Sequence, residues 1–149
     1  MSDGDAREAL LKAYQATLYE VEINGEVQVM RVGQRLPAII DAQLAANRTR
    51  DAAFLSAANP RSRVCDDVQN ANRHAALLHA LHELGVEWLA GNGRDRTGQW
   101  PAEPSVLALG LGREQAMKLA GQFQQNAYLE VVPGARVRLV MTAHWSSPE

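Results

Sequence analysis

The chain has 149 residues, with 15 Lys and Arg against 17 Asp and Glu, a net charge of −2 and one cysteine. This length suits a single domain that buries roughly 70% of its unfolded surface. The composition, 46% hydrophobic and 21% charged, is close to the globular average and argues against collagen, a disordered tail and a coiled coil. The near-zero charge is not the footprint of a nucleic-acid-binding protein. Cys65 alone excludes an internal disulfide and a cysteine-based zinc site.

The first residues are acidic and do not place a basic segment before an apolar run, so they do not form a signal peptide. No apolar stretch approaches the ~20 residues that span a bilayer. We therefore expect a cytoplasmic protein with no membrane partner.

The first half of the chain predicts a helix, a hairpin and a second helix. Residues 6–15 are good helix formers. Apolar residues then alternate with polar ones over 19–23 and 27–30, and Asn24-Gly25 between them is the strongest short hairpin signal. Apolar spacing over 36–44 predicts a helix of about ten residues, with Pro37 in its first turn.

The rest of the chain alternates strands and helices. We expect a buried strand over 51–58, a helix from Asp66 or Asp67 to Leu84 ended by Gly85, a strand over 86–90, a Gly-rich loop over 91–104, a strand over 105–109, a helix over 113–124 and a hairpin of 127–132 with 136–142, followed by a tail over 143–149. The fold class is thus α/β (α+β): one domain over 1–149, in which about three to four helices pack on a mixed sheet with two hairpins.

The helix that starts near Asp67 carries polar residues on its apolar face. Leu77, Leu81 and Leu84 form a stripe that continues into Asn70, Arg73 and His74 at the N-terminal end. Helix N-termini favour anions, so this end is a candidate ligand site. The alternatives are that the stripe emerges into solvent there, or that the polar side chains form a structural network.

Two other segments carry candidate site residues. The loop after the buried strand holds Asn59, Arg61 and Ser62, in the place where open sheets bind ligands. Glu103, near Trp100 and before Ser105, is a candidate general base, although such a Glu also pairs with an Arg or caps a turn. Trp100 is either a stacking platform for a ligand or a lid on the core.

These motifs occur together in a known family. The segments that carry the resemblance are Ala57-Ala58-Asn59-Pro60-x-Ser62, Asn70-x-x-Arg73, Gly98-x-Trp100 with Glu103-Pro104-Ser105, and Ala116-x-x-Leu119-Ala120-x-x-Phe123-x-Gln125-Asn126-Ala127. In this order they resemble the bacterial domain of unknown function 3293, over roughly residues 12–141. The resemblance implies no reaction, but it adds Gln125 and Asn126 to the residues that belong together, although Asn126 also suits a helix cap.

Other signals are weak. The four histidines do not share a helix face at metal-ligand spacing, so we predict no metal and no cofactor. Gly110-x-Gly112 lacks the remaining residues of a phosphate loop. Cys65 is a packing residue rather than a nucleophile.

Two functions remain. The first is binding of a small anionic ligand, nucleotide-like or phosphorylated, in a polar pocket at the strand ends, with Glu103 as a candidate base. The second is a non-catalytic structural or protein-interaction module whose polar motif residues form a buried hydrogen-bond network. The edges of either hairpin allow a homodimer, and nothing in the sequence selects one.

The arginines favour the first function. Thirteen of the 15 basic residues are arginine, which a GC-rich genome also explains, but seven of them fall within residues 48–96, around the motif loops.

Overall fold

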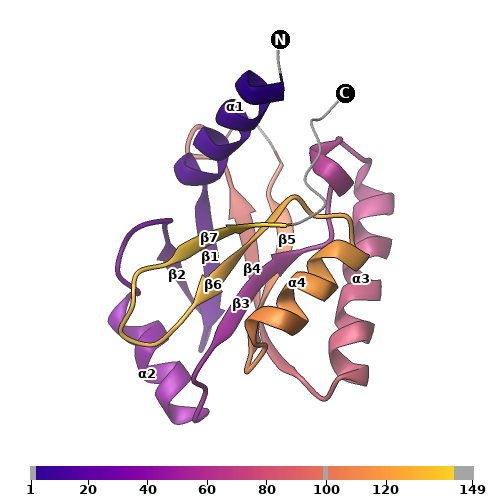
Figure 1. The fold of residues 1–149 in the computed structure, drawn as a ribbon. Coiled ribbons are helices and arrows are strands. Elements are labelled where there is room, and N and C mark those ends of the chain that lie inside the picture. The colour runs from indigo at the N-terminus through magenta and orange to yellow at the C-terminus, as the bar shows by residue number, and fades with distance from the viewer. Residues whose placement is uncertain (1–2, 99–100, 143–149) are drawn as a thin grey trace.

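The structure is a computed structural model of the chain and describes residues 3–98 and 101–142 (Figure 1). Its elements are α1 (Asp3–Ala16), β1 (Leu18–Ile23), β2 (Glu26–Met30), α2 (Ala38–Ala46), β3 (Ala52–Ser56), the 3-10 helix η1 (Pro60–Ser62), α3 (Asp67–Glu83), β4 (Glu87–Arg94), β5 (Glu103–Leu109), α4 (Arg113–Gln122), β6 (Ala127–Val131) and β7 (Arg138–Met141).

The strands form one seven-stranded sheet in the order β2-β1-β4-β5-β3-β6-β7. The predicted α+β class and both hairpins are confirmed. Where the sequence suggested a mixed sheet, every pair of neighbouring strands among the described residues is antiparallel. The first hairpin turns at Asn24 and Gly25, whose φ values of 52° and 80° are those that this two-residue turn requires.

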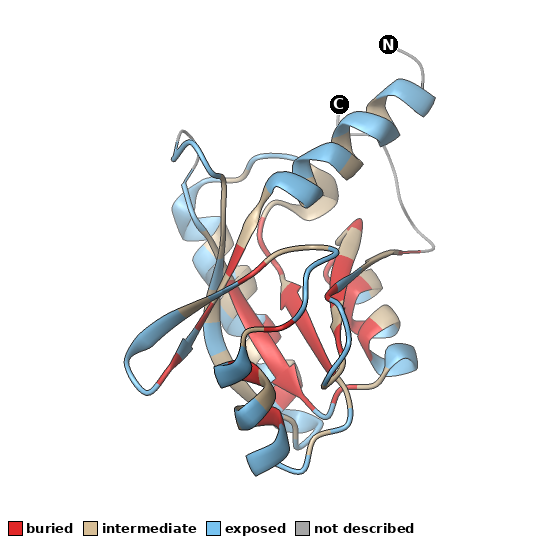
Figure 2. Cartoon of the chain, turned by 90° about the vertical axis from the view of Figure 1, so that its left-hand side faces the viewer, coloured by how far each residue is buried: buried red, intermediate tan, exposed pale blue. Residues whose placement is uncertain are grey.

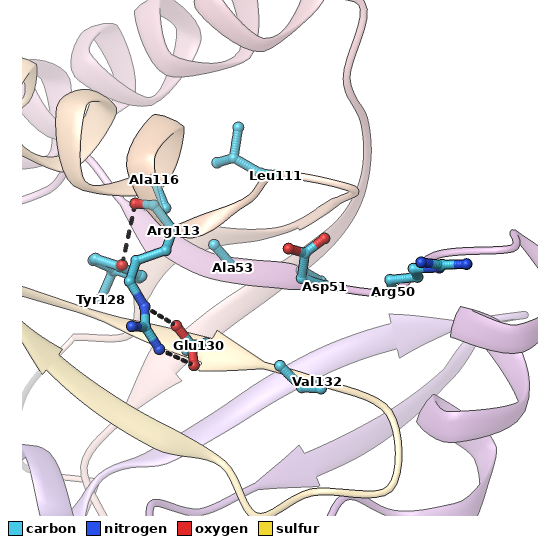
Figure 3. A pocket seen from close by; sticks show the side chains of 10 residues that line it. Arg50, Asp51, Ala53, Leu111, Arg113, Ala116, Tyr128, Glu130 and Val132 are labelled. Carbon is cyan, nitrogen blue, oxygen red and sulfur yellow. Dashed lines mark hydrogen bonds and ion pairs between the residues drawn. The ribbon is translucent and has the colours of Figure 1, made fainter.

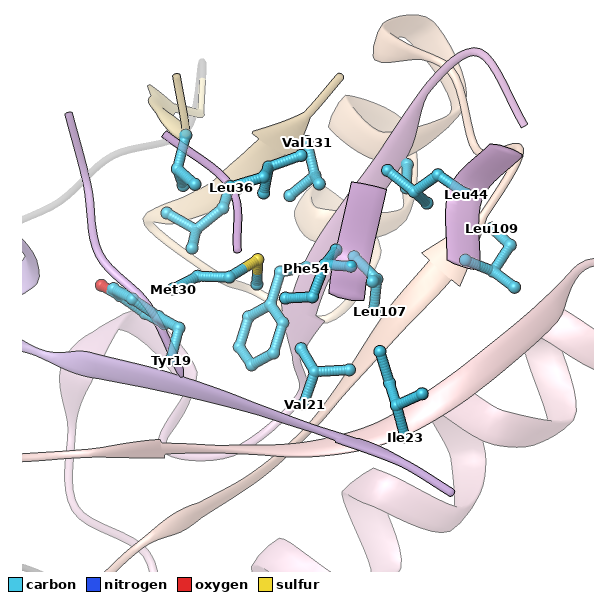
Figure 4. Close-up of a cluster of buried hydrophobic side chains, with 14 residues drawn as sticks. Tyr19, Val21, Ile23, Met30, Leu36, Leu44, Phe54, Leu107, Leu109 and Val131 are labelled. Carbon is cyan, nitrogen blue, oxygen red and sulfur yellow. The ribbon is translucent and has the colours of Figure 1, made fainter. Parts of the chain in front are cut away.

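Each face of the sheet has its own apolar core. On one face α2 packs Ile40 and Leu44, both fully buried, against the sheet (Figure 4). At the centre of this cluster the rings of Tyr19 and Phe54 meet edge to face, with centroids 5.5 Å apart. On the other face α3 and α4 cover the central strands. This division explains why β3 reads as a continuous apolar run, since four of its five residues are buried.

The α3 stripe is buried only in its middle. Leu77 and Leu81 are covered, whereas Leu84 is the C-cap residue and 50% exposed. The predicted continuation of the core stripe to Leu84 therefore stops one turn early.

The predicted Gly-rich loop is shorter than expected, because both of its ends are strand. β4 continues to Arg94 and β5 begins at Glu103, with Gly93 opposite Glu103. Gly91 is a packing requirement rather than a loop signal: a Cβ there would lie 2.3 Å from the Glu20 carbonyl oxygen and 3.0 Å from the Phe54 ring. Glycine inside a strand often marks such a close approach.

Helix α1 is the least buried element. Among its residues 4–16 none is buried, and Figure 2 shows the helix without a buried segment beside the buried strands of the sheet. Over the described residues, no helix is both long and apolar enough to cross a membrane.

Candidate functional site

The predicted polar residues gather where β3 ends, β5 begins and α3 starts. Antiparallel pairing brings this about, because Ser56 at the end of β3 lies opposite Ser105 near the start of β5. The Ser56 hydroxyl fixes the corner: it donates to the Pro104 carbonyl (3.1 Å) and accepts from the Ala58 amide (3.0 Å).

Asn59 is the hub of this region. Its side-chain oxygen accepts from the Cys65 amide and from Asn70 Nδ2, both at 2.9 Å. Its side-chain nitrogen donates to Glu103 Oε1 at 2.9 Å, and its own amide donates to Asn70 Oδ1 at 2.9 Å. Asn59 and Asn70 thus bond each other reciprocally, which ties α3 to the loop and leaves the side-chain amide of Asn59 directed at a carboxylate.

Arg73 is engaged by main-chain carbonyls. Its Nε donates to the Ala57 oxygen at 2.5 Å, one terminal nitrogen donates to the Phe123 oxygen, and the other lies 3.4 Å from Gln124 Oε1. Phe123 is the C-cap residue of α4, where carbonyls lack helical partners and a cation is favourable. The guanidinium therefore joins α3 to the ends of β3 and α4.

The N-terminus of α3, predicted to favour an anion, is occupied by the chain itself. The Asp66 carboxylate accepts from the Gln69 amide at 2.7 Å, and the Gln69 side chain accepts from the Asp66 amide at 3.2 Å. This is a capping box, with Asp67 also in the first turn. An anion placed on this helix end would meet two carboxylates.

The Glu103 carboxylate retains an oxygen that can still accept a hydrogen bond. Burial raises its pKa, and the hydrogen bond from Asn59 opposes this only in part. Among the described residues, Oε1 takes the Asn59 bond and Oε2 has no hydrogen-bond partner. A carboxyl group that is partly buried, has a raised pKa and is held by one oxygen is able to exchange a proton or to receive a ligand hydroxyl.

Tyr14 of α1 approaches the same point, and no sequence signal marked it, because it reads as an ordinary helix residue. Burial raises the pKa of Tyr14 to about 12, against a hydrogen bond from the Ser62 side chain, and the nearby Glu103 carboxylate raises it further. Ser62 in turn accepts from Asn126 Nδ2 at 3.3 Å. We call Tyr14, Asn59, Ser62, Glu103 and Asn126 the Glu103 cluster.

Ser105 and Gln125 support the main chain around the cluster. The Ser105 hydroxyl donates to the Glu103 carbonyl oxygen at 3.0 Å and is buried. Gln125 Nε2 donates to the Ala58 oxygen at 3.0 Å and to the Phe123 oxygen at 3.2 Å. Both side chains therefore bond main-chain oxygens next to the cluster.

The loop that holds Asn59 is strained. Asn59, Arg61 and Ser62 have φ values of 48°, 53° and 62°, in the left-handed region that non-glycine residues rarely adopt. The Arg61 amide donates to the carbonyl of Gln124, another left-handed residue, at 2.6 Å. Such backbone strain persists only where the surroundings enforce it, and it concentrates at functional sites.

Two further predicted residues are Trp100 and His74. Trp100 lies outside the described residues. His74 Nδ1 is buried and, among the described residues, has no hydrogen-bond partner, and burial lowers its pKa. Within the described ranges no three His, Cys, Asp or Glu side chains are grouped to hold a metal ion.

The opposite end of the sheet is open and charged. A cavity of about 290 Å³ lies beside the start of β3, lined by Asp51, Arg113 and Glu130 among others (Figure 3). Arg113 pairs with Glu130 through two bonds of 2.8 and 3.0 Å and lowers the pKa of that carboxyl. A second cavity of about 460 Å³ shares Arg50 and Asp51 with the first. Neither cavity is lined by a predicted site residue.

Comparison with known families matches residues 55–128 to the family described as "Protein of unknown function (DUF3293)". The chain resembles that family as the motifs predicted, over a shorter range than 12–141. The matched range contains Asn59, Ser62, Glu103 and Asn126 but not Tyr14. No curated protein and no solved structure matches the chain.

Proposed function

We propose that this relative of a family of unknown function binds a small ligand that combines hydroxyl groups with an anionic group, such as a sugar phosphate or a nucleotide, at the Glu103 cluster. The observation that carries the proposal is the second oxygen of Glu103, which accepts no bond from the described residues although Asn59 already orients the partly buried carboxyl group. Carboxylates commonly accept hydrogen bonds from ligand hydroxyls, as in ribose recognition.

The anionic part of the ligand is assigned to the side of the loop where Arg61 and Arg63 flank Ser62. Arg73 is not assigned to the ligand, because each of its three guanidinium nitrogens already donates one hydrogen bond to a protein oxygen. A cytoplasmic location, where such metabolites occur, belongs to the same proposal.

Thermal unfolding with a small panel tests this. Ribose 5-phosphate, glucose 6-phosphate and adenosine monophosphate are compared with ribose and with inorganic phosphate. A ligand at one hundred times its Kd stabilises the folded state by about 2.7 kcal/mol. We expect this with at least one phosphorylated compound, its loss in Glu103→Gln, and its weakening in Arg61→Ala.

The matched control is Asp51→Asn at the opposite end of the sheet. It changes a carboxylate to an amide, as Glu103→Gln does, and lines both cavities. We expect it to leave the stabilisation unchanged. Stabilisation that survives Glu103→Gln, or that disappears in Asp51→Asn, contradicts the proposed site. A raised pKa also suits Glu103 to accept a proton from a bound hydroxyl, and the binding test does not depend on that step.

The second candidate function is a non-catalytic structural or interaction module. It is favoured by the reciprocal Asn59–Asn70 bonds and by the use of Arg73 within the protein. On this view no compound in the panel stabilises the chain, and Glu103 serves only to receive Asn59.

A further inference from the structure

Strand β2 forms one edge of the sheet (Figure 1) and pairs with β1 alone among the described strands. Its outer face is apolar: Val27 is 58% exposed and Val29 is 38% exposed. β2 contains no proline, and its one charged residue, Glu26, is its first residue. Natural edge strands usually carry such residues, because they prevent pairing with another strand.

The hairpin turn determines which main-chain groups of β2 are free. A two-residue turn at Asn24-Gly25 is closed by the pair Ile23 and Glu26, which lie opposite each other. In antiparallel pairs, residues alternate between those bonded to the partner strand and those that point away. Counting from the closing pair, the amides and carbonyls of Val27 and Val29 point to the open side.

The free amides and carbonyls of Val27 and Val29 are complementary to the same groups in a second copy of the chain. With Gln28 on a two-fold axis, antiparallel pairing sets Val27 of one copy opposite Val29 of the other. Each of the two Val27–Val29 pairs forms two main-chain hydrogen bonds, and the four valine side chains lie together on one face of the sheet. In this register Glu26 of one copy lies opposite Met30 of the other, so Glu26 and the partner copy's Arg31 come to the same end of the pairing, although on opposite faces of the sheet.

The other sheet edge is less suited. β7 spans four residues, Arg138–Met141, and begins with Arg138, which lies 3.6 Å from Glu130. A very short edge strand offers few main-chain groups for self-pairing, and Arg138 is already paired within its own chain.

We propose that the chain forms a symmetric homodimer through antiparallel pairing of β2 with β2 of a second copy, centred on Gln28. The sheet then continues through the interface as fourteen strands, seven from each copy. The Glu103 cluster contributes no residue to this contact, so a test of the dimer does not decide the proposed function, and the reverse is also true.

Sedimentation and light scattering of the full chain test the dimer. We expect about twice the chain mass of 16.3 kDa for the wild type. Val29→Lys gives the mass of one chain at the same concentration, because the added charge lies on the pairing face. The matched control is Val68→Lys, which changes a valine that is 71% exposed on α3 and leaves the mass doubled.

A double variant tests the pairing register. In V27E/V29K each introduced acid lies opposite an introduced base of the other copy, so we expect the doubled mass to return. Circular dichroism confirms that each variant is folded before its mass is interpreted. A wild-type chain of single mass overturns the proposal and leaves the β2 edge to a strand of another protein. A doubled mass in Val29→Lys, or a single mass in V27E/V29K, overturns the symmetric pairing.

Discussion

The two ends of the central strands use their polar side chains differently. Where β3 ends, polar side chains turn inward and bond to one another and to main-chain carbonyls, as Asn59 and Arg73 do. Where β3 begins, charged side chains turn outward, pair at the surface as Arg113 and Glu130 do, and line open cavities. The motif residues concentrate at the first end, and the described cavities lie at the second.

At one end of the sheet the polar side chains are ordered by hydrogen bonds, whereas at the other end charged side chains line the described cavities. Hydrogen bonds at the Glu103 cluster fix a loop in an unfavourable backbone conformation and hold one carboxyl group in place. The ion pairs at the other end are exposed on the arginine side, where solvent and salt weaken them. We therefore expect substitutions at the two ends to differ in size and in pH dependence.

The largest effect is expected from the two arginines. Arg73→Ala leaves the Ala57 and Phe123 carbonyls without their donor and lowers the free energy of unfolding by about 3 kcal/mol. Arg113→Ala removes an ion pair whose arginine side chain is 61% exposed, and its effect is much smaller. Urea denaturation of both variants measures the contrast. Equal losses would mean that the two ends are equally important for stability.

A smaller effect is expected when Asn59 is replaced. Asn59→Gly keeps the left-handed backbone and removes the side-chain bonds, which costs about 2 kcal/mol of unfolding free energy. Asn59→Ala adds the cost of a left-handed alanine, roughly 1 kcal/mol more. The difference between the two variants in urea denaturation therefore measures the backbone strain. If Asn59→Ala is as stable as Asn59→Gly, the loop relaxes and the strain is not enforced by its surroundings.

The smallest effects are expected in the pH dependence of stability, which has opposite signs for Glu103 at one end and Glu130 at the other. The raised pKa of Glu103 means that its contribution to stability is present below the ordinary carboxyl pKa and lost as the pH rises through the raised value. The side chain of Glu103→Gln still accepts the hydrogen bond from Asn59 but does not titrate. Its free energy of unfolding therefore increases relative to that of the wild type as the pH rises. Glu130 has a lowered pKa, so its contribution is present above the ordinary value and lost on acidification. Glu130→Gln is then less stable than the wild type at neutral pH, and the difference shrinks at low pH.

Unfolding measured between pH 4 and pH 8 shows both trends. A difference between Glu103→Gln and the wild type that does not change with pH would mean that the Glu103 carboxyl titrates as in the unfolded chain. The two variants serve as controls for each other, because each replaces a glutamate by its amide.

Much of the fold follows from local patterns in the sequence. Asn24-Gly25 and the alternation around it predict the first hairpin, and the Asp66 cap predicts the start of α3. Gly91 favoured the prediction of a loop, which was wrong there because composition cannot show that a neighbouring ring fills the place of a side chain. Tertiary packing decides that case.

Which residues lie together at the candidate site could be predicted from the sequence, but the contacts that each of them makes could not. The helix face of α3 and the loop after β3 bring Asn59, Asn70 and Arg73 together. Periodicity cannot show that the Arg73 donors meet carbonyls, since the positions of Ala57 and Phe123 depend on the whole sheet. Tyr14 was missed because its place beside Ser62 depends on where α1 lies, which no local pattern encodes.

The left-handed loop also has a consequence for laboratory evolution. Arg61 and Ser62 occupy a conformation that glycine adopts at little cost, so replacing either by glycine relieves roughly 1 kcal/mol of strain. A selection for heat resistance alone is expected to reach these codons early, whereas, if the proposed function holds, a selection that also demands binding of the proposed ligand preserves them. The codons that differ between the survivors of the two selections then mark the part of the loop that serves the proposed binding rather than folding.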